Sequence, residues 1–466
     1  MSKFSYLEVR EYLKSFLSDE SEETSVLSGF SIDSRTIKHG ETFVALKGVN
    51  FNGHNFIKEA ISKGARNVIC QDDDTLSNLS AGDRAILFKV EDTYNFIYQL
   101  AKYKRSKFSF PIIAVTGSNG KTTVKELIAA LLSSQFSVYK NYLNQNNILG
   151  LSLNILNCGF DYDYGVFEVG ISKEGEMDML LDILKPDHGL ITNISATHLE
   201  FLRDEEIVFQ EKMKLFQSLK EGSFAFYSKD QDRFKSLERE IEIDLKFKTF
   251  GFKENNDHWL NIDNINLDGL KLNYKNNLNL SSKLLGYKNG FNIIAALSVA
   301  VEFGLDLNLI KKTLSEFRPL NSRMNYEKCL DLDIIDDSYN SSPQALVAGL
   351  EFISSLNYDG LKIAVLSDML ELGSSSDNKH LEIGAFAANL NIDYYFCYGV
   401  CIRHFIQGLN SQGFPRERII FLNKEMLADK IVTTVNQTEE SCMLFFKASH
   451  TMGIDDIIKR VKKRVG

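Results

Sequence analysis

The chain has 466 residues, a length that predicts about two to four domains rather than one core. Its 53 basic and 62 acidic residues give a net charge of −9, which argues against nonspecific binding of nucleic acid. The longest mainly apolar stretch, residues 293–303, is too short to span a membrane, and the N-terminus lacks the apolar core of a signal peptide. Six cysteines without a Cys-x-x-Cys pair fit a reducing compartment, so a cytoplasmic protein is expected.

The first region, residues 1–108, mixes short strands with helical stretches. Strands are expected at 43–46, 67–70 and 85–89, where apolar residues cluster. The pattern predicts a small α/β domain.

A phosphate-binding loop opens the second region, residues 109–325. The apolar run at 111–115 predicts a strand, and apolar residues at three- and four-residue spacing from Val124 to Leu132 predict a helix. Between them the loop contains glycines that let the backbone approach phosphates, a lysine for the outer phosphates and a threonine for magnesium. The candidate nucleotide-binding residues are Thr116, Gly117, Ser118, Asn119, Gly120, Lys121, Thr122 and Thr123. The shortened spacing Gly-x-x-Gly-Lys-Thr, with Val115 where a further glycine is usual, still predicts binding of ATP or GTP.

Two polar residues after later strands are candidate metal ligands. Glu168 ends the strand expected at 164–169, at the sheet edge where ligands gather, and with Thr122 it could bind magnesium. Residues 189–192 form another expected strand, and His198 follows it. From the residues alone, Glu168 fits equally well as a solvated strand end, and a lone histidine such as His198 is more often structural than a ligand.

The remaining elements complete an α/β pattern. Alternating apolar residues at 262–274 around Asp268-Gly269 predict a hairpin, which we interpret as a small antiparallel addition to the central parallel sheet. In the third region, residues 326–466, strands are expected at 334–336, 362–366, 394–398, 419–422 and 443–446. The sequence therefore predicts three α/β domains: a small first domain, a central mononucleotide-binding domain and a Rossmann-like C-terminal domain.

Taken in order, the motifs resemble the Mur ligase family over nearly the whole chain. The resemblance is carried by residues 31–35, 40–48 and 52–56, then 116–123, 144–150, 168–176 and 192–200, then 286–296 and 323–324, and finally 336–343 and 368–380. It implies an ATP-dependent ligase of peptidoglycan precursor synthesis, and hence of cell-wall biogenesis, cell shape and cell division. The implied reaction joins D-alanyl-D-alanine to UDP-N-acetylmuramoyl-tripeptide through an acyl phosphate, which gives the pentapeptide product, ADP and phosphate.

The resemblance also implies roles for the three domains. Residues 1–108 would bind the UDP-sugar substrate, residues 109–325 would bind ATP, and residues 326–466 would bind the incoming dipeptide. A cytoplasmic monomer is expected.

The resemblance implies further site residues. Lys121, His198, Lys212 and Arg323 would be catalytic, and Asn292, Arg323, Asp337 and Asn340 would join the loop in binding nucleotide. The implied substrate-binding residues are Ser31, Ser34, Arg35, Lys47, Gly48, His54, Asn144, Asn146 and Asn147.

The resemblance further implies two magnesium sites. One magnesium would lie on Thr122 and Glu168, and a second on His198 and a carbamylated Lys212. An unmodified lysine is a cation and would repel the metal, whereas its carbamate is an anionic oxygen ligand. Lys214 is the neighbouring alternative, and without the resemblance both lysines would fit a solvated helix face.

Other functions stay open at this point. A sister ligase that adds a single amino acid, or a folylpolyglutamate synthase, would share the loop, although the Asp-Asn-Pro-Arg segment of the diamino-acid-adding ligases is absent. A catalytically silent muropeptide-binding protein is a further possibility. The chain also departs from the family's usual residues at Lys288 (His), Ser322 (Gly), Ser342 (Asn), Ala448 (Gly) and His450 (Arg).

Overall fold

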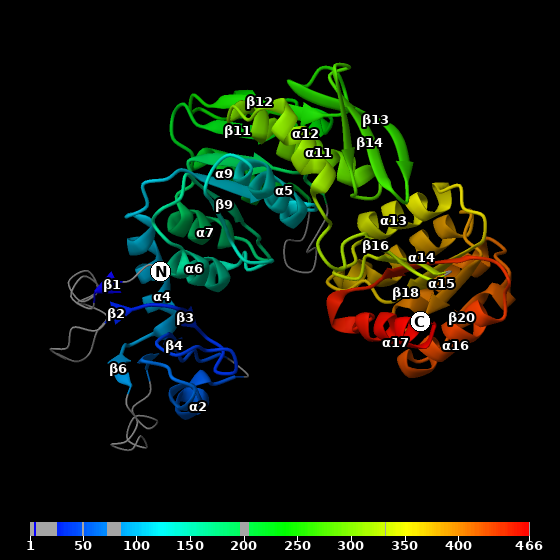
Figure 1. Cartoon of the computed structure of the whole chain (residues 1–466), viewed down its shortest axis with the longest axis horizontal. Coiled ribbons are helices and arrows are strands. Elements are labelled where there is room, and N and C mark those ends of the chain that lie inside the picture. The colour runs from blue at the N-terminus through cyan, green and yellow to red at the C-terminus, as the bar shows by residue number, and fades with distance from the viewer. Residues whose placement is uncertain are drawn as a thin grey trace.

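The computed structural model describes residues 4–5, 26–48, 51–71, 85–195, 205–330 and 332–465. It contains sheets of four, nine and six strands in chain order, and a two-stranded antiparallel ribbon of β1 (Phe4–Ser5) and β2 (Val26–Leu27). We call the three sheets with their helices the first unit (β3–β6), the central unit (β7–β15) and the C-terminal unit (β16–β21). Figure 1 shows the first and C-terminal units on opposite sides of the molecule, joined through the central unit.

The first unit is a parallel sheet with the strand order β3-β4-β5-β6. Its elements are β3 (Phe30–Ser31), β4 (Thr42–Val44), η1 (Gly53–Phe56), α2 (Ile57–Ser62), β5 (Asn67–Cys70), β6 (Ile86–Lys89) and α4 (Thr93–Arg105). The three expected strands are confirmed to within two residues at each end. Helix α4 packs on the central unit, because Lys104 Nζ donates to Leu156 O (2.6 Å) and Arg105 Nε donates to Leu184 O (2.6 Å).

The central unit has the strand order β15-β14-β13-β12-β11-β10-β7-β9-β8, and pairing is parallel except among β13, β14 and β15. Its strands are β7 (Ile112–Thr116), β8 (Val138–Lys140), β9 (Tyr164–Glu168), β10 (His188–Ile191), β11 (Phe224–Tyr227), β12 (Lys246–Gly251), β13 (His258–Asn266), β14 (Gly269–Tyr274) and β15 (Leu278–Ser282). Its helices are α5 (Lys121–Ser133), α6 (Ile148–Asn157), α7 (Glu176–Leu184), α9 (Glu205–Gln217), η2 (Asp232–Phe234), α10 (Leu237–Glu240), α11 (Tyr287–Glu302) and α12 (Leu307–Glu316). The expected parallel sheet is confirmed.

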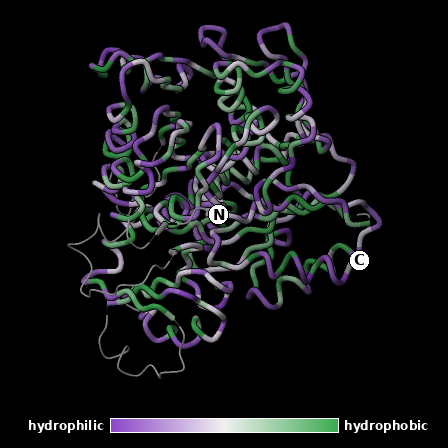
Figure 2. Tube along the Cα trace, turned by 60° about the vertical axis from the view of Figure 1, so that its left-hand side comes forward, coloured by the Kyte–Doolittle hydropathy of each residue, from purple (hydrophilic) through white to green (hydrophobic). Residues whose placement is uncertain are grey.

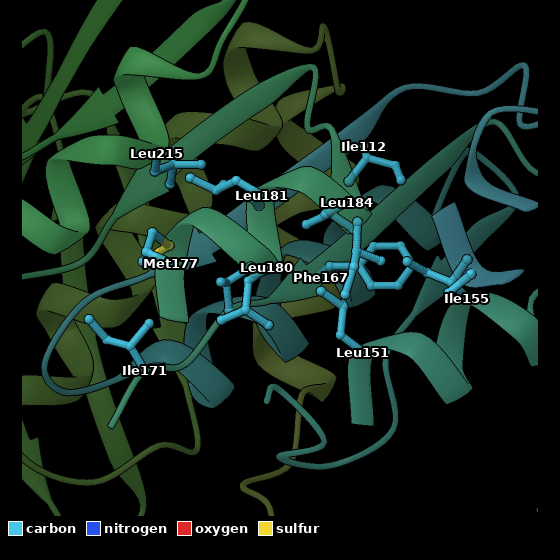
Figure 3. Close-up of a cluster of buried hydrophobic side chains, with 14 of the residues drawn as sticks. Ile112, Leu151, Ile155, Phe167, Ile171, Met177, Leu180, Leu181, Leu184 and Leu215 are labelled. Carbon is cyan, nitrogen blue, oxygen red and sulfur yellow. The ribbon is translucent and has the colours of Figure 1, made fainter. Parts of the chain in front are cut away.

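Both faces of this sheet are covered by helices. Successive side chains of a strand point to opposite faces, so Ile113 and Val115 pack with α5, α11 and α12, whereas Ile112 and Ala114 pack with α6, α7 and α9. Figure 3 shows the second of these cores, in which Ile112 and Phe167 from the sheet meet leucines of α6 and α7. This burial on both faces explains why β7 and most of β9 read as continuous apolar runs.

The hairpin expected around Asp268-Gly269 is present as β13 and β14, with Asn266 opposite Gly269. It continues the main sheet and also contacts the C-terminal unit. Ile265 and Leu267, near its tip, pack against the hydrophobic core of the C-terminal unit. The hairpin therefore joins two units as well as extending a sheet.

The C-terminal unit is a sheet with the order β16-β17-β21-β18-β19-β20, all parallel except β16. Its elements are β16 (Asn325–Cys329), β17 (Leu332–Asp336), α13 (Pro343–Ser355), β18 (Leu361–Leu366), η3 (Gly373–Ser375), α14 (Ser376–Ala387), β19 (Tyr394–Cys397), α15 (Ile402–Ser411), η4 (Arg416–Arg418), β20 (Ile419–Phe421), α16 (Lys424–Asn436), β21 (Cys442–Lys447), η5 (His450–Met452) and α17 (Asp455–Val465). All five expected strands are confirmed. Strand β16 was not expected from the sequence, because its residues, Asn-Tyr-Glu-Lys-Cys, form no apolar run at this edge of the sheet.

Helices cover both faces of this sheet as well, with α13, α14 and α15 on one face and α16 and α17 on the other. Figure 2 shows hydrophobic and hydrophilic residues alternating along α17 beside the C-terminus, as expected for a helix with one buried face. No disulfide joins any of the six cysteines, all of which lie within the described residues. Within the described residues no helix is long and apolar enough to cross a membrane.

Candidate functional site

The phosphate loop runs from the end of β7 to the start of α5, as the sequence predicts. Two of its glycines adopt positive φ, +142° at Gly117 and +81° at Gly120. A Cβ atom at Gly117 would lie 1.9 Å from Thr192 Oγ1, and one at Gly120 would lie 2.3 Å from Asn292 Oδ1. Side chains are therefore disfavoured at both positions, which leaves room for a ligand beside the N-terminus of α5.

A second loop, after β10, holds the phosphate loop in shape. Ser118 N–H donates to Asn193 O (2.7 Å), and Thr192 Oγ1 donates to Asn119 O (2.7 Å). The Ser118 hydroxyl donates to Ser195 O (2.8 Å) and accepts from Ser195 N–H (2.9 Å). Residues 192–194 belong to one of the sequence motifs, but no role was expected for them. Their position after a buried strand was the available signal.

The lysine of the loop is positioned by the loop itself. Lys121 Nζ donates to Gly117 O (2.9 Å) and Ser118 O (3.1 Å). Burial lowers the pKa of Lys121, the positive charge of Arg323 lowers it further, and the negative charge of Glu168 opposes both. The amine thus lies among groups that can present it to an anion bound in the loop.

The carboxylate at the end of β9 has an unused oxygen. Glu168 is 1% exposed, which rules out the solvated strand end considered from the sequence. Its Oε1 accepts from Asn146 Nδ2 (2.7 Å), whereas Oε2 is buried without a hydrogen-bond partner among the described residues. A buried carboxylate oxygen without a partner is costly, and magnesium binds such oxygens, so Glu168 fits a metal ligand.

Thr122, the other candidate ligand, lies on the same cavity wall, and its Oγ1 accepts from Arg323 (3.1 Å). Within the described residues no three His, Cys, Asp or Glu side chains cluster as a metal site. The protein would therefore supply few ligands, as is usual for magnesium.

The two candidate lysines of α9 differ sharply. Lys212 is 2% exposed, and burial followed by the positive charge of Lys121 drives its pKa well below the ordinary value, against an opposing effect of Glu211. Lys214 is partly exposed and pairs with Asp178 (2.7 Å) and with Glu211. The solvated helix face that the sequence allowed for both lysines is wrong for Lys212. His198 lies outside the described residues.

The C-terminal unit contributes the facing groups. The Arg323 guanidinium lies 3.7 Å from the centre of the Tyr339 ring. Lys447 pairs with the Asp337 carboxylate, and its Nζ donates to Asn340 O (3.1 Å). Ser322, one of the departures from the family pattern, adopts φ +60°, which explains why glycine is usual there.

One cavity of about 1400 Å³ brings most of these residues together at the junction of the central and C-terminal units. Its lining includes the predicted nucleotide-binding residues Ser118, Asn119, Gly120, Lys121, Thr122, Thr123, Asn292, Arg323, Asp337 and Asn340, together with Glu168, Asn144, Asn146 and Asn147. Thr116 and Gly117, at the start of the loop, do not line this cavity, and the Thr116 hydroxyl donates to Val169 O (2.9 Å). The cavity can hold a large anionic ligand beside a metal-binding carboxylate.

The remaining predicted substrate-binding residues lie on the first unit, outside this cavity: Ser31, Ser34, Arg35, Lys47, Gly48 and His54. The Ser34 hydroxyl donates to Glu59 (2.8 Å), and the buried His54 accepts from Gln71 N–H (3.0 Å). In this conformation the structure does not bring these residues together with the phosphate loop.

Comparison with known proteins assigns the chain to a family. Residues 115–300 match the Mur ligase middle domain, and residues 26–105 match the Mur ligase family catalytic domain. The chain is 31% identical to the UDP-N-acetylmuramoyl-tripeptide–D-alanyl-D-alanine ligase of Bacillus subtilis over 98% of both chains, and 31% identical to that of Borreliella burgdorferi over 93% and 94%.

Solved structures agree in fold. MurF from Acinetobacter baumannii superposes with a TM-score of 0.87 at 23% identity over 99% of both chains. MurF from Thermotoga maritima, solved with ADP, gives 0.77 at 27% identity over 94% of this chain and 98% of that one. With full-length similarity and an intact phosphate loop, the chain belongs to the Mur ligase family of ATP-dependent ligases.

Proposed function

We propose that this enzyme joins D-alanyl-D-alanine to UDP-N-acetylmuramoyl-tripeptide, with conversion of ATP to ADP and phosphate. One observation carries the proposal. Residues 337, 339–343 and 370–372, which belong to the region expected to bind the incoming dipeptide, line the same cavity as the phosphate loop. The names of the full-length relatives support the same substrates. We expect the enzyme to act as a monomer in the cytoplasm.

The proposed reaction has two steps. The tripeptide carboxylate attacks the γ-phosphorus of ATP, which forms an acyl phosphate and releases ADP. The dipeptide amine then attacks the acyl carbon, phosphate leaves the tetrahedral intermediate, and the amine releases a proton. Both reactants of the first step are anions, so positioning and charge neutralisation are the main contributions the protein can make.

The residues of the cavity suit those contributions. Lys121 and the backbone amides at the N-terminus of α5 would hold the outer phosphates, and Arg323, already hydrogen-bonded to Thr122, would add positive charge from the junction with the C-terminal unit. Asn292, Asp337 and Asn340 would bind the nucleoside side. Magnesium would be held by Thr122 and the unpartnered oxygen of Glu168, and when bound it would neutralise phosphate charge.

A carbamate on Lys212 is part of the proposal, with His198 as its companion ligand for a second metal. Carbon dioxide adds to a neutral amine, and the lowered pKa of Lys212 favours that form. The resulting anion would interact favourably with the nearby Lys121. Protein labelled with ¹³C-bicarbonate should show a carbamate carbon signal that the Lys212→Ala variant lacks.

The proposed division of labour assigns the UDP-sugar substrate to residues 1–108, ATP to residues 109–325 and the dipeptide to residues 326–466. The first and C-terminal units lie apart in Figure 1, so catalysis would require closure around the central unit. Small-angle scattering should show a more compact enzyme when nucleotide and UDP-substrate are both present. An unchanged scattering curve would contradict closure.

The decisive experiment measures phosphate release from ATP with UDP-N-acetylmuramoyl-tripeptide, with and without D-alanyl-D-alanine, and the mass of the product. Release that depends on the dipeptide, with a product heavier by one joined dipeptide, is expected. Dependence on a single amino acid and a shorter UDP-muramoyl-peptide would indicate a sister ligase. Absence of turnover in all mixtures would indicate a silent muropeptide-binding protein.

A further inference from the structure

The N-terminus of α13 forms part of the cavity wall and holds a serine whose hydroxyl is unused. Ser341 lies just before this helix and is 4% exposed, and its Oγ has no hydrogen-bond partner among the described residues. The backbone around it is fixed, because Ser341 N–H donates to Asn340 Oδ1 (2.9 Å). Ser341 also lines the cavity that contains the phosphate loop. A buried hydroxyl held in this way is a donor without an acceptor.

The first turn of α13 provides a second hydrogen-bond donor beside the Ser341 hydroxyl. Pro343, at its first position, has no N–H, and the Ser342 hydroxyl accepts from Ala345 N–H (3.4 Å). Gln344 therefore carries the first available amide, at the positive end of a 13-residue helix.

A lysine of the central unit reaches the first turn of α13. Lys288 lines the cavity and donates to the backbone oxygen of Gln344, and no described carboxylate forms an ion pair with it. Its neighbour Lys447 differs, because Lys447 pairs with Asp337. Lys447, Asp337 and Glu351 are the charged groups that act on Lys288. Lys288 is thus a cavity cation without a counter-ion.

We infer that Ser341, Lys288 and the amide of Gln344 form an oxyanion subsite that binds the terminal carboxylate of the incoming dipeptide. The inference rests on the proposed function and deepens it. A nucleotide phosphate carries the same oxyanion chemistry, and the experiment below separates the two sources. Neither Ser341 nor Lys288 is among the residues that the sequence analysis expected in the site.

The position of the subsite favours the carboxylate. Asn119 of the phosphate loop donates to Gln344 Oε1 (3.4 Å), so the helix N-terminus lies beside the place where the acyl phosphate would form. Two extended residues span roughly 7 Å, so a dipeptide whose amine attacks there keeps its carboxylate close by. Ala345, Ala348 and Leu370 line the neighbouring wall and provide apolar surface for two methyl side chains. The nucleotide phosphates already have a binding site in the phosphate loop.

The test compares D-alanyl-D-alanine with D-alanyl-D-alaninamide, in which a neutral amide replaces the terminal carboxylate. We expect the wild-type enzyme to prefer the acid in kcat/KM by at least roughly tenfold, as for a lost charge-assisted hydrogen bond. Ser341→Ala and Lys288→Met should each reduce that preference several-fold and leave KM for ATP within about twofold. Because the preference is a ratio within one preparation, partial misfolding of a variant does not change it.

Two matched variants serve as controls. Ser355→Ala removes a serine hydroxyl at the other end of α13, where it donates to Phe352 O (2.8 Å). Lys253→Met removes a different lysine from the cavity lining. Both should keep the wild-type preference for the acid.

Each outcome decides the inference. Wild-type preference retained in both Ser341→Ala and Lys288→Met overturns it. A raised KM for ATP with the preference intact overturns the carboxylate assignment and identifies the bound oxyanion as a nucleotide phosphate. A wild-type enzyme that joins neither dipeptide refutes the proposed function itself, and the carboxylate assignment with it.

Discussion

Replacing Gly117 by alanine tests whether the phosphate loop is held in shape by the loop after β10. The added Cβ would lie 1.9 Å from Thr192 Oγ1, which a side-chain rotation could relieve, but also 3.0 Å from Thr192 N and 3.1 Å from Asn193 N, which it could not. The backbone conformation, φ +142°, is also one that alanine rarely adopts.

The expected loss of stability is the sum of the backbone strain and the steric clash. Strained backbone costs about 1–3 kcal/mol and overpacking about 1–3 kcal/mol, so the central unit should lose about 2–6 kcal/mol of unfolding free energy. Gly222→Ala is the matched control, since Gly222 also has positive φ (+77°) but has no atom within 4 Å of an added Cβ. That variant should lose only about 1–2 kcal/mol.

Thermal unfolding and ADP titration calorimetry provide the assay. For a unit of this size 1 kcal/mol shifts Tm by about 2–4 °C, so Gly117→Ala should melt several degrees below Gly222→Ala. It should also bind ADP more weakly, because relief of the clash moves the loop amides. If Gly117→Ala matched Gly222→Ala in Tm and wild type in ADP affinity, the proposed constraint between the two loops would be refuted.

Three further predictions concern lysines. Lys121→Ala should lower kcat by at least roughly 10²–10³-fold because a transition-state charge contact is lost, and phosphate release within a few-fold of wild type would remove Lys121 from the mechanism. Lys212→Ala should be nearly inactive but partly rescued by small carboxylic acids in the same assay, whereas full activity without rescue would shift the carbamate to Lys214 or exclude it. Desolvation of the amine within the cavity and the charge of Lys447 lower the pKa of Lys288 to about 8. Protonated Lys288 attracts the dipeptide carboxylate, so the kcat/KM preference for acid over amide should fall as pH rises from 7 to 9. Lys288→Arg, which stays charged, should keep that preference constant, and parallel pH profiles for the two enzymes would contradict the role of this charge.

Local sequence was sufficient where structure is built from consecutive residues. The strand, glycine-rich loop and helix at 112–133 were predictable because spacing and residue type define each part within a short segment. The hairpin turn at Asp268-Gly269 was predictable for the same reason. Burial on both faces made β7, β9 and β10 visible as apolar runs, whereas β8, β11, β12 and the edge strand β16 were not predicted.

Tertiary structure alone decided the chemistry of individual side chains. Lys212 and Lys214 are two residues apart and look alike in sequence, yet packing of α9 on the central sheet buries one amine and leaves the other in ion pairs. Arg323 reaches Thr122 across 201 positions in the chain, and Lys288 meets Gln344 from another unit. The sequence by itself determined the family, the fold class and the phosphate loop, because these depend on local patterns. Which amine loses its charge and which hydroxyl lacks a partner depend on how separate units pack, because desolvation and pairing are set by neighbours distant in the chain.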